Sequence, residues 1–289
     1  MQTFRSSFQQ TAKKVDLPPD FWRWSVAERR AWFVKEVMVK YLPKEVLPGD
    51  LLAGARFNIM TSCCLDKGEA REYNRHICGK NGSRAAMLWY HNHGFGNAGA
   101  TSGHLIPGYA PVIEKGWRFI YADLDRRLKA LSPVDQNGKK GAQLCAMLTA
   151  ASMARDLANA YQEVLVTLAE QEQDTCRKAE LRQMAANLGR VPWEPAETFW
   201  EAVQSLWLTH MLVMADENYP GPGVSFGRID QYLYPAWKRS LKAGMDREFG
   251  KEILKCFWVH CNTAYDAYFT AIGKELQDEI IARESHTIG

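Results

Sequence analysis

The sequence predicts a mainly α-helical fold, formed by one domain or by part of one, and three observations support this prediction. Apolar residues recur three or four positions apart through 112–131 and 142–188, the spacing that places them on one face of a helix. Near positions 25 and 198, Ser or Thr precedes Glu by three residues, which is the capping box that starts a helix. No internal repeat or low-complexity linker divides the 289 residues.

The first expected helix follows the capping box of Ser25 and Glu28 and runs to Leu42, because Pro43 cannot continue it. A turn with the sequence LPGD then leads into the short apolar run 51–60. This run is either a strand or an extended buried segment, since its period fits both.

Glycines are concentrated in residues 79–111, and neither a helical nor a strand period fits 94–111. Long irregular segments inside compact proteins are usually functional or disordered. The aromatic and apolar content of this stretch argues against disorder. We therefore expect an ordered, backbone-rich loop.

Helices are expected over most of the remaining sequence. Residues 142–188 form one long helical stretch that Gly189 and the nearby Pro192 close. The next helix covers 199–214 and is broken by ENYPGPGVSFGR, which has two prolines and three glycines. A last helical region is expected from 229 to about 281.

Composition argues against two classes of partner. A formal net charge of +3 with no basic run gives no electrostatic footprint for nucleic acid or anionic lipid. No run of about 18 apolar residues and no secretory signal is found, so neither a membrane span nor export is expected. The seven cysteines lack the spacing of a disulfide framework. These features favour a cytoplasmic protein with reduced thiols.

Two patterns that suggest chemistry have plainer explanations. Histidine and cysteine side chains that could bind a transition metal are spaced irregularly, so packing roles are favoured and no metal is expected; they are His91, His93, His104, Cys63, Cys64 and Cys78. The glycines of GFGNAG at 94–99 match a dinucleotide-binding spacing, but no strand precedes them and no helix follows.

Other polar residues in apolar surroundings are expected to be structural. Cys256 and Cys261 fit core packing, and a nucleophile pair with His260 is disfavoured because adjacent helical residues point apart. His210 on the 199–214 helix is interpreted as a hydrogen-bonded core histidine. Arg228 and Asp230 are expected to form a buried pair that positions the preceding loop.

Three segments carry a family resemblance. Residues 103–124 begin with GHLIPGY, residues 198–235 end in RIDQYLYP, and the sequence ends in ESHTIG. In this order they resemble segments of glycyl radical enzymes of the pyruvate formate-lyase type. The resemblance covers roughly residues 40–289 and is spread over several segments, which makes it more specific than one short pattern.

The resemblance implies the N-terminal part of a ten-stranded α/β barrel, with 1–289 as a partial pyruvate formate-lyase-like domain. A separate iron–sulfur activase that uses S-adenosylmethionine would install a glycyl radical, which passes to a cysteine that abstracts hydrogen from the substrate. The sequence contains neither the G-C cysteine loop nor the R-V-x-G-Y radical loop. Both are expected beyond Gly289, so no catalytic residue and no bound cofactor is assigned to this segment.

What this segment would supply is a substrate-binding set of His104, Gly223, Ser225 and Phe226. In related diol dehydratases the histidine matching His104 contacts a substrate hydroxyl, and a serine matching Gly223 does likewise. Because Gly223 has no hydroxyl, a polyol would leave a buried group unpaired at about 1–3 kcal/mol. An apolar substrate is therefore expected.

The sequences PGPGVSFGRIDQY and NAGATSGHLIPGY are most similar to benzylsuccinate and alkylsuccinate synthases, which add a hydrocarbon radical to fumarate. An arylacetate decarboxylase is the second candidate, and a formate acetyltransferase is the third. The expected partners are the small-molecule substrate, fumarate and the activating enzyme, in an oligomer that can include small subunits. A non-catalytic helical binding or scaffold protein also stays open, and the sequence downstream of the codon for Gly289 would discriminate it.

Overall fold

The computed structural model describes residues 13–55, 57–59, 61–78, 82–94, 105–217, 224–262, 265–266 and 269–270. Helices dominate: α2 (Val26–Glu36), α3 (Lys67–Cys78), α4 (Ser83–Asn92), α5 (Tyr109–Lys129), α6 (Pro133–Gln136), α7 (Lys139–Gln171), α8 (Thr175–Leu188), α9 (Phe199–Glu217), α10 (Ile229–Lys242) and α11 (Arg247–Cys261). The short strands are β1 (Lys13–Lys14), β2 (Phe57–Asn58), β3 (Tyr265–Asp266) and β4 (Phe269–Thr270). Short helical turns cover Phe21–Arg23, Val37–Tyr41 and Ser62–Cys64.

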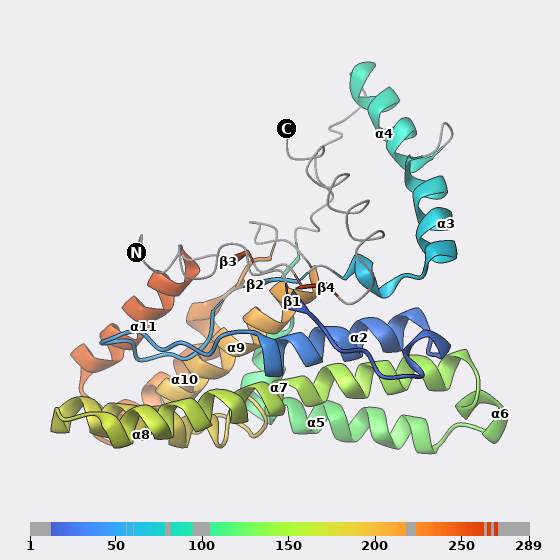
Figure 1. Cartoon of the computed structure of the whole chain (residues 1–289). Coiled ribbons are helices and arrows are strands. Elements are labelled where there is room, and N and C mark those ends of the chain that lie inside the picture. The colour runs from blue at the N-terminus through green and yellow to red at the C-terminus, as the bar shows by residue number, and fades with distance from the viewer. Residues whose placement is uncertain are drawn as a thin grey trace.

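The long helix α7 is the centre of a helical body, and α8, α2 and α5 pack along it (Figure 1). Its inward face is built from small and aliphatic residues, which allow the neighbouring helices to approach closely. The buried positions include Ala151, Ala154, Leu157, Ala158, Tyr161, Leu165 and Ala169.

Helix α9 connects this body to α10 and α11. It is buried over most of its length, and its apolar side chains join the main core cluster. Aromatic contacts fix the three helices: the Phe199 and Trp237 ring centroids are 4.8 Å apart, and those of Trp200 and Phe249 are 5.1 Å apart.

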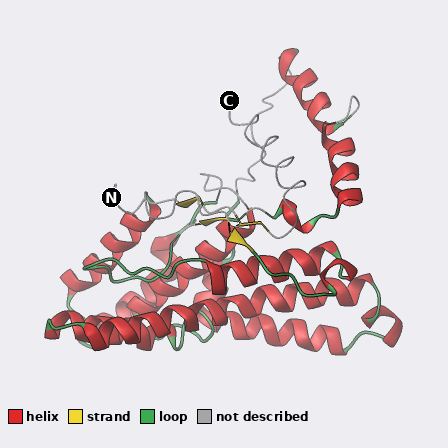
Figure 2. Cartoon of the chain, in the orientation of Figure 1, coloured by secondary structure: helices red, strands yellow, loops and turns green. Residues whose placement is uncertain are grey.

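Figure 2 shows the short strands gathered on one side of the helices. β1 pairs with β4, and β2 pairs with β3, both in parallel. Each pair joins an early part of the described chain to a late part, so these two contacts bring distant sequence together. Parallel pairing is the arrangement that α/β folds use.

Helices α3 and α4 project away from the body (Figure 1). They carry exposed aromatic side chains, Tyr73, Trp89 and Tyr90. At the base of this projection, Arg29 Nη2 of α2 lies 2.6 Å from Glu69 Oε1 of α3.

Both predicted capping boxes are confirmed. The Ser25 hydroxyl accepts from the Glu28 amide, and the Glu28 carboxylate accepts from the Ser25 amide. The Glu201 amide donates to Thr198 Oγ1 at 3.1 Å, and the Thr198 amide donates to Glu201 Oε2 at 2.9 Å. The helix after Ser25 continues through a π turn, Val37–Tyr41, before Pro43.

Three predicted boundaries are wrong. Residues 79–111 were expected to be loop, but α4 covers Ser83–Asn92 and α5 begins at Tyr109; GFGNAG lies mostly outside the described residues. The stretch 142–188 is two helices, because the Asp174 carboxylate caps a new helix by accepting from the Arg177 amide at 2.7 Å. The region after 229 is also two helices, and 265–266 and 269–270 are strands; the rest of the expected helix beyond Asn262 lies outside the described residues.

Candidate functional site

Two irregular segments that are far apart in the sequence meet in the structure. Leu105 and Val224 form a parallel bridge, and the Ser225 amide donates to the Leu105 carbonyl oxygen at 3.0 Å. We name residues 105–108 and 224–228 the paired segments. They directly follow His104 and Gly223 in the sequence, so the bridge joins the two regions in which a substrate site is predicted.

Close packing and a side-chain hydrogen bond hold the second of the paired segments. Gly227 has φ of 66°, in the left-handed region that glycine tolerates. A Cβ atom at this position would lie 2.8 Å from Ile106 Cγ2. The Tyr232 hydroxyl donates to the Phe226 carbonyl oxygen at 2.8 Å. Both contacts limit where the backbone of this segment can lie.

A buried histidine is close to both paired segments. His210 on α9 is 2% exposed and Tyr109, the first residue of α5, is 1% exposed. His210 Nδ1 and the Tyr109 hydroxyl share a hydrogen bond of 2.8 Å. The Phe226 ring centroid lies 4.3 Å from that of His210 and 4.9 Å from that of Phe257. One imidazole thus contacts the residue after the first segment and a residue within the second.

A second polar pair, His260 and Asp50, lies next to Trp207, which is fully buried. The Trp207 ring centroid is 5.8 Å from that of His210 and 4.9 Å from that of His260. His260 Nε2 lies 2.9 Å from Asp50 Oδ2, and both side chains are largely buried. The site therefore consists of packed aromatic rings and two buried histidines: His210 is hydrogen-bonded to Tyr109, and His260 to Asp50.

Burial raises the pKa of both tyrosine hydroxyls at this site. Desolvation is the main cause for Tyr109, with the nearby ionisable groups of Tyr232 and Cys261 adding to it, and it is the cause for Tyr232. A raised pKa favours the neutral phenol. Both hydroxyls therefore stay protonated near neutral pH and act as hydrogen-bonding groups.

The structure describes half of the predicted substrate-binding set. His104 and Gly223 lie outside the described residues. Ser225 is exposed, and Phe226 is half-buried against His210. The roles of all four toward a substrate stay predictions.

Of the predicted structural residues, His210 is confirmed as a hydrogen-bonded core histidine. Arg228 and Asp230 do pair, with Nη2 and Oδ2 2.8 Å apart, but the predicted burial is wrong because their side chains are 69% and 63% exposed. Both lie at the solvent-exposed start of α10. An exposed pair of this kind contributes little to stability.

The other candidate chemistry has a structural explanation where the structure describes it. Cys256 and Cys261 pack against the core cluster, as predicted, and burial raises the pKa of the Cys256 thiol. Within the described ranges, no three His, Cys, Asp or Glu side chains are grouped closely enough to hold a metal ion. None of the described helices is long and apolar enough to span a membrane.

Sequence reasoning missed Tyr109, Tyr232, Trp207 and Asp50 as site residues. Two had a signal, because Tyr109 closes the GHLIPGY pattern and Tyr232 lies within RIDQYLYP. Trp207 and Asp50 had none, since their importance depends on contacts between α9, α11 and the segment before residue 51.

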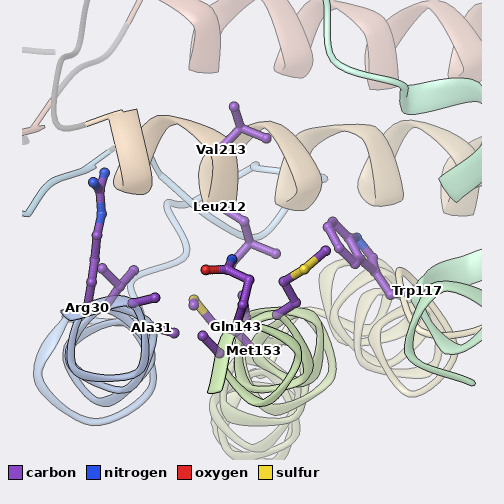
Figure 3. Close-up of a pocket in the computed structure, with 12 residues that line it drawn as sticks. Arg30, Ala31, Trp117, Gln143, Met153, Leu212 and Val213 are labelled. Atoms are coloured by element: carbon purple, nitrogen blue, oxygen red, sulfur yellow. The ribbon is translucent and has the colours of Figure 1, made fainter. Parts of the chain in front are cut away.

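A separate open cavity of about 390 Å³ lies between α2, α7, α9 and α5. Figure 3 shows Ala31 and Arg30 on one side, Gln143 and Met153 on another, and Leu212 above them. Its lining is mainly apolar, and none of the described residues that line it belongs to the paired segments.

Comparison with known proteins identifies the family. The model of the family described as "Pyruvate formate lyase-like" matches residues 83–279, which include both paired segments. The chain belongs to the pyruvate formate lyase-like family. This match confirms the resemblance at family level.

Curated relatives of this family share moderate identity with the chain. It is 33% identical over 187 residues to isethionate sulfite-lyase of Desulfovibrio desulfuricans, covering 64% of this chain and 22% of that protein. It is 39% identical over 88 residues to indoleacetate decarboxylase of Tractidigestivibacter scatoligenes, covering 30% of this chain and 10% of that protein. The chain thus spans about a fifth, or less, of the length of these relatives.

A solved structure supports the fold class. A glycyl radical enzyme from Archaeoglobus fulgidus aligns with a TM-score of 0.65 and 23% identity, over 92% of this chain and 40% of that one. The prediction of a mainly helical segment of a glycyl radical enzyme fold is confirmed.

Proposed function

We propose that this chain supplies one wall of the substrate pocket of a glycyl radical enzyme that acts on an apolar substrate. The observation that supports this best is the parallel bridge between Leu105 and Val224. It joins the segments that follow His104 and Gly223, and the rings of Phe226 and Tyr109 lie beside it. Apolar and aromatic surfaces with a few placed polar groups are typical of small-molecule sites.

In this proposal the residues of the chain bind and orient the substrate. His104 provides a hydrogen-bonding group, Phe226 provides an apolar surface, and Ser225 lies next to it on the same segment. The glycine at 223 offers no hydroxyl, so a site that leaves a substrate hydroxyl unpaired would discriminate against polyols.

The radical chemistry would come from outside the residues present here. A glycyl radical, installed by a separate iron–sulfur activase that uses S-adenosylmethionine, would supply hydrogen abstraction through a cysteine. The activating enzyme is therefore a proposed partner, and assembly into an oligomer in the cytoplasm is part of the proposal.

Two reactions fit an apolar pocket. Addition of a hydrocarbon to fumarate is suggested by the similarity of PGPGVSFGRIDQY to the synthases of that type. Decarboxylation of an arylacetate is favoured by a second observation, the 39% identity to an indoleacetate decarboxylase. We place decarboxylation first for this reason; formate acetyltransferase, whose substrates are small and polar, is the weakest candidate.

The test uses the enzyme made anaerobically from its complete reading frame and activated by its activase. We expect kcat/KM for indoleacetate, or for toluene with fumarate, to exceed that for glycerol by about 10-fold to 100-fold, because an unpaired buried hydroxyl costs about 1–3 kcal/mol. Equal efficiency with glycerol would contradict an apolar pocket.

A substitution in the same enzyme tests the binding set. His104→Ala should lower kcat/KM by about tenfold or more while the melting temperature stays unchanged. The reading frame itself tests the non-catalytic alternative: a frame that continues past the codon for Gly289 into a G-C loop and an R-V-x-G-Y loop would rule out a stand-alone scaffold.

A further inference from the structure

The paired segments meet through the Leu105–Val224 bridge and through the close approach of Ile106 to Gly227. One backbone hydrogen bond, from the Ser225 amide to the Leu105 carbonyl, accompanies the bridge. Ser225 and Gly227 are exposed. A single hydrogen bond of this kind contributes about 0.5–1.5 kcal/mol. Other contacts must therefore keep the segments aligned.

Helix α9 holds the backbone of neighbouring segments with the polar groups of its side chains. The segment 51–55 shows how it does so. Gln204 bonds both sides of one residue: the Ala53 amide donates to Gln204 Oε1 at 2.9 Å, and Gln204 Nε2 donates to the Ala53 carbonyl at 2.9 Å. Trp200 Nε1 donates to the Leu51 carbonyl at 2.6 Å. These contacts fix the extended segment 51–55 along the helix, as a neighbouring strand would.

His210 lies six positions after Gln204 on the same helix and contacts Tyr109, next to the first paired segment, and Phe226 in the second. Its Nδ1 is hydrogen-bonded to Tyr109, which directly follows residues 105–108. Its ring packs on Phe226 in 224–228. Tyr232, which donates to the Phe226 carbonyl, has its ring centroid 6.4 Å from that of Tyr109.

The directional character of the His210 contact matters. An apolar side chain could fill this space, but apolar contacts do not specify one alignment. A buried hydrogen bond does, because a shift of one partner leaves both groups unpaired in a desolvated site. The neutral state of Tyr109, which burial favours, preserves the bond near neutral pH.

We propose that the Tyr109–His210 hydrogen bond is a positioning device that sets the register of the 105–108 segment against the 224–228 segment. His210 and Tyr109 act here as positioning residues, through the segments that they hold. The importance of this register for catalysis rests on the proposed function, whereas the register itself is a property of the chain.

The first experiment measures hydrogen exchange in the 289-residue chain. Tyr109→Phe removes the hydroxyl and keeps the ring, and Tyr161→Phe on α7 is the matched control, since Tyr161 is also 1% exposed and lies in the helical body. We expect amides in 224–228 to exchange about tenfold faster in Tyr109→Phe than in Tyr161→Phe, since loss of about 1.4 kcal/mol of local protection is a factor of ten. Exchange within twofold of the control would overturn the proposal.

A second variant separates positioning from simple loss of stability. His210→Phe combined with Tyr109→Phe removes both polar groups of this hydrogen bond and keeps two rings. We expect its melting temperature to recover toward the wild-type value while exchange in 224–228 stays fast. Recovery of slow exchange would show that packing alone sets the register and would overturn the proposal. If the double variant does not fold, the Tyr109→Phe comparison decides.

The activated full-length enzyme provides a readout that global stability does not change. Tyr109→Phe should raise KM for the accepted substrate about fivefold to tenfold with a smaller change in kcat, because a misaligned pocket weakens binding. Fast exchange of 224–228 in Tyr109→Phe, in an enzyme that prefers glycerol, would refute the apolar substrate and keep the positioning role. Slow exchange of 224–228 in Tyr109→Phe, in an enzyme that uses an apolar substrate, would refute the positioning role and keep the apolar substrate.

Discussion

The helical body and the segments that lie on it are stabilised in different ways. In the body, α7 packs along α8, α2 and α5 through many buried small and aliphatic side chains. The extended segments 51–55, 105–108 and 224–228 are held by single side chains of α9, at the segment or next to it: Gln204 bonds Ala53, and His210 bonds Tyr109 and packs on Phe226. The body can therefore absorb many substitutions, whereas each segment depends on one or two contacts.

The strongest test of this comparison is Trp207→Ala, because Trp207 lies next to Gly54 of the 51–55 segment and also packs against α11. Its ring is fully buried and packs against Phe257, His210 and His260. We expect a loss of about 3–5 kcal/mol in the free energy of unfolding, the usual cost of a large core truncation. Urea denaturation followed by circular dichroism measures it. Trp258→Ala on α11, at a side chain 51% exposed, should change it by about 0.5 kcal/mol.

A smaller effect is expected from Gly227→Ala, which tests the segments alone. At φ of 66° the alanine is strained by about 1–2 kcal/mol, and its Cβ would also press on Ile106. We expect faster proteolysis within 224–228 and a modest loss of global stability. Gly244→Ala is the control, because Gly244 has φ of 95° but no neighbour within 4 Å of a Cβ. Equal protease sensitivity of 224–228 in both variants would show that the Ile106 contact is unimportant.

Within the body, a substitution of Asp156 tests one ion pair between α7 and α2, the contact of Asp156 Oδ2 with Lys35 Nζ at 2.6 Å. Burial raises the pKa of its carboxyl, but the hydrogen bonds from Lys35 and Arg155 outweigh burial, so the net pKa is lowered. A lowered folded-state pKa stabilises the protein above the unfolded aspartate pKa, and this stabilisation is lost as the pH falls through the folded-state value. Asp156→Asn should cost about 1 kcal/mol at pH 7.

The pH dependence of that cost is the sharper observation. The difference in unfolding free energy between wild type and Asp156→Asn should shrink as the pH falls below the ordinary aspartate range. A constant difference down to the lowest pH at which the chain stays folded would mean that the carboxylate charge is not responsible.

The smallest effect is expected on the projecting helix α3. Hydrogen bonds from Arg75 and His76 lower the pKa of Glu72, but all three side chains are more than half exposed. Glu72→Gln should leave the thermal midpoint unchanged, because solvent and salt screen such pairs. A measurable shift would indicate that α3 is coupled to the body more tightly than its exposure suggests.

Local sequence determined much of the body. The capping boxes at Ser25 and Thr198 are formed as predicted because each uses residues only three positions apart. The break between α7 and α8 was missed because neither Gly nor Pro marks it, and only the Asp174 cap reveals it. Helix α4 was missed because glycines on both sides of it suggested a loop. The predicted burial of Arg228 and Asp230 failed because charge pairing in sequence does not specify depth.

The sequence by itself determined the family, most helix positions and three of the described residues near the site, Ser225, Phe226 and His210. Only the tertiary structure decided that residues 105 and 224 are neighbours, that His210 bonds Tyr109, and that Asp50 bonds His260. The physical reason is the range of the interactions. Helix periods and caps depend on residues within one or two turns, whereas the partners at this site are brought together only when α5, α9 and α11 pack against one another.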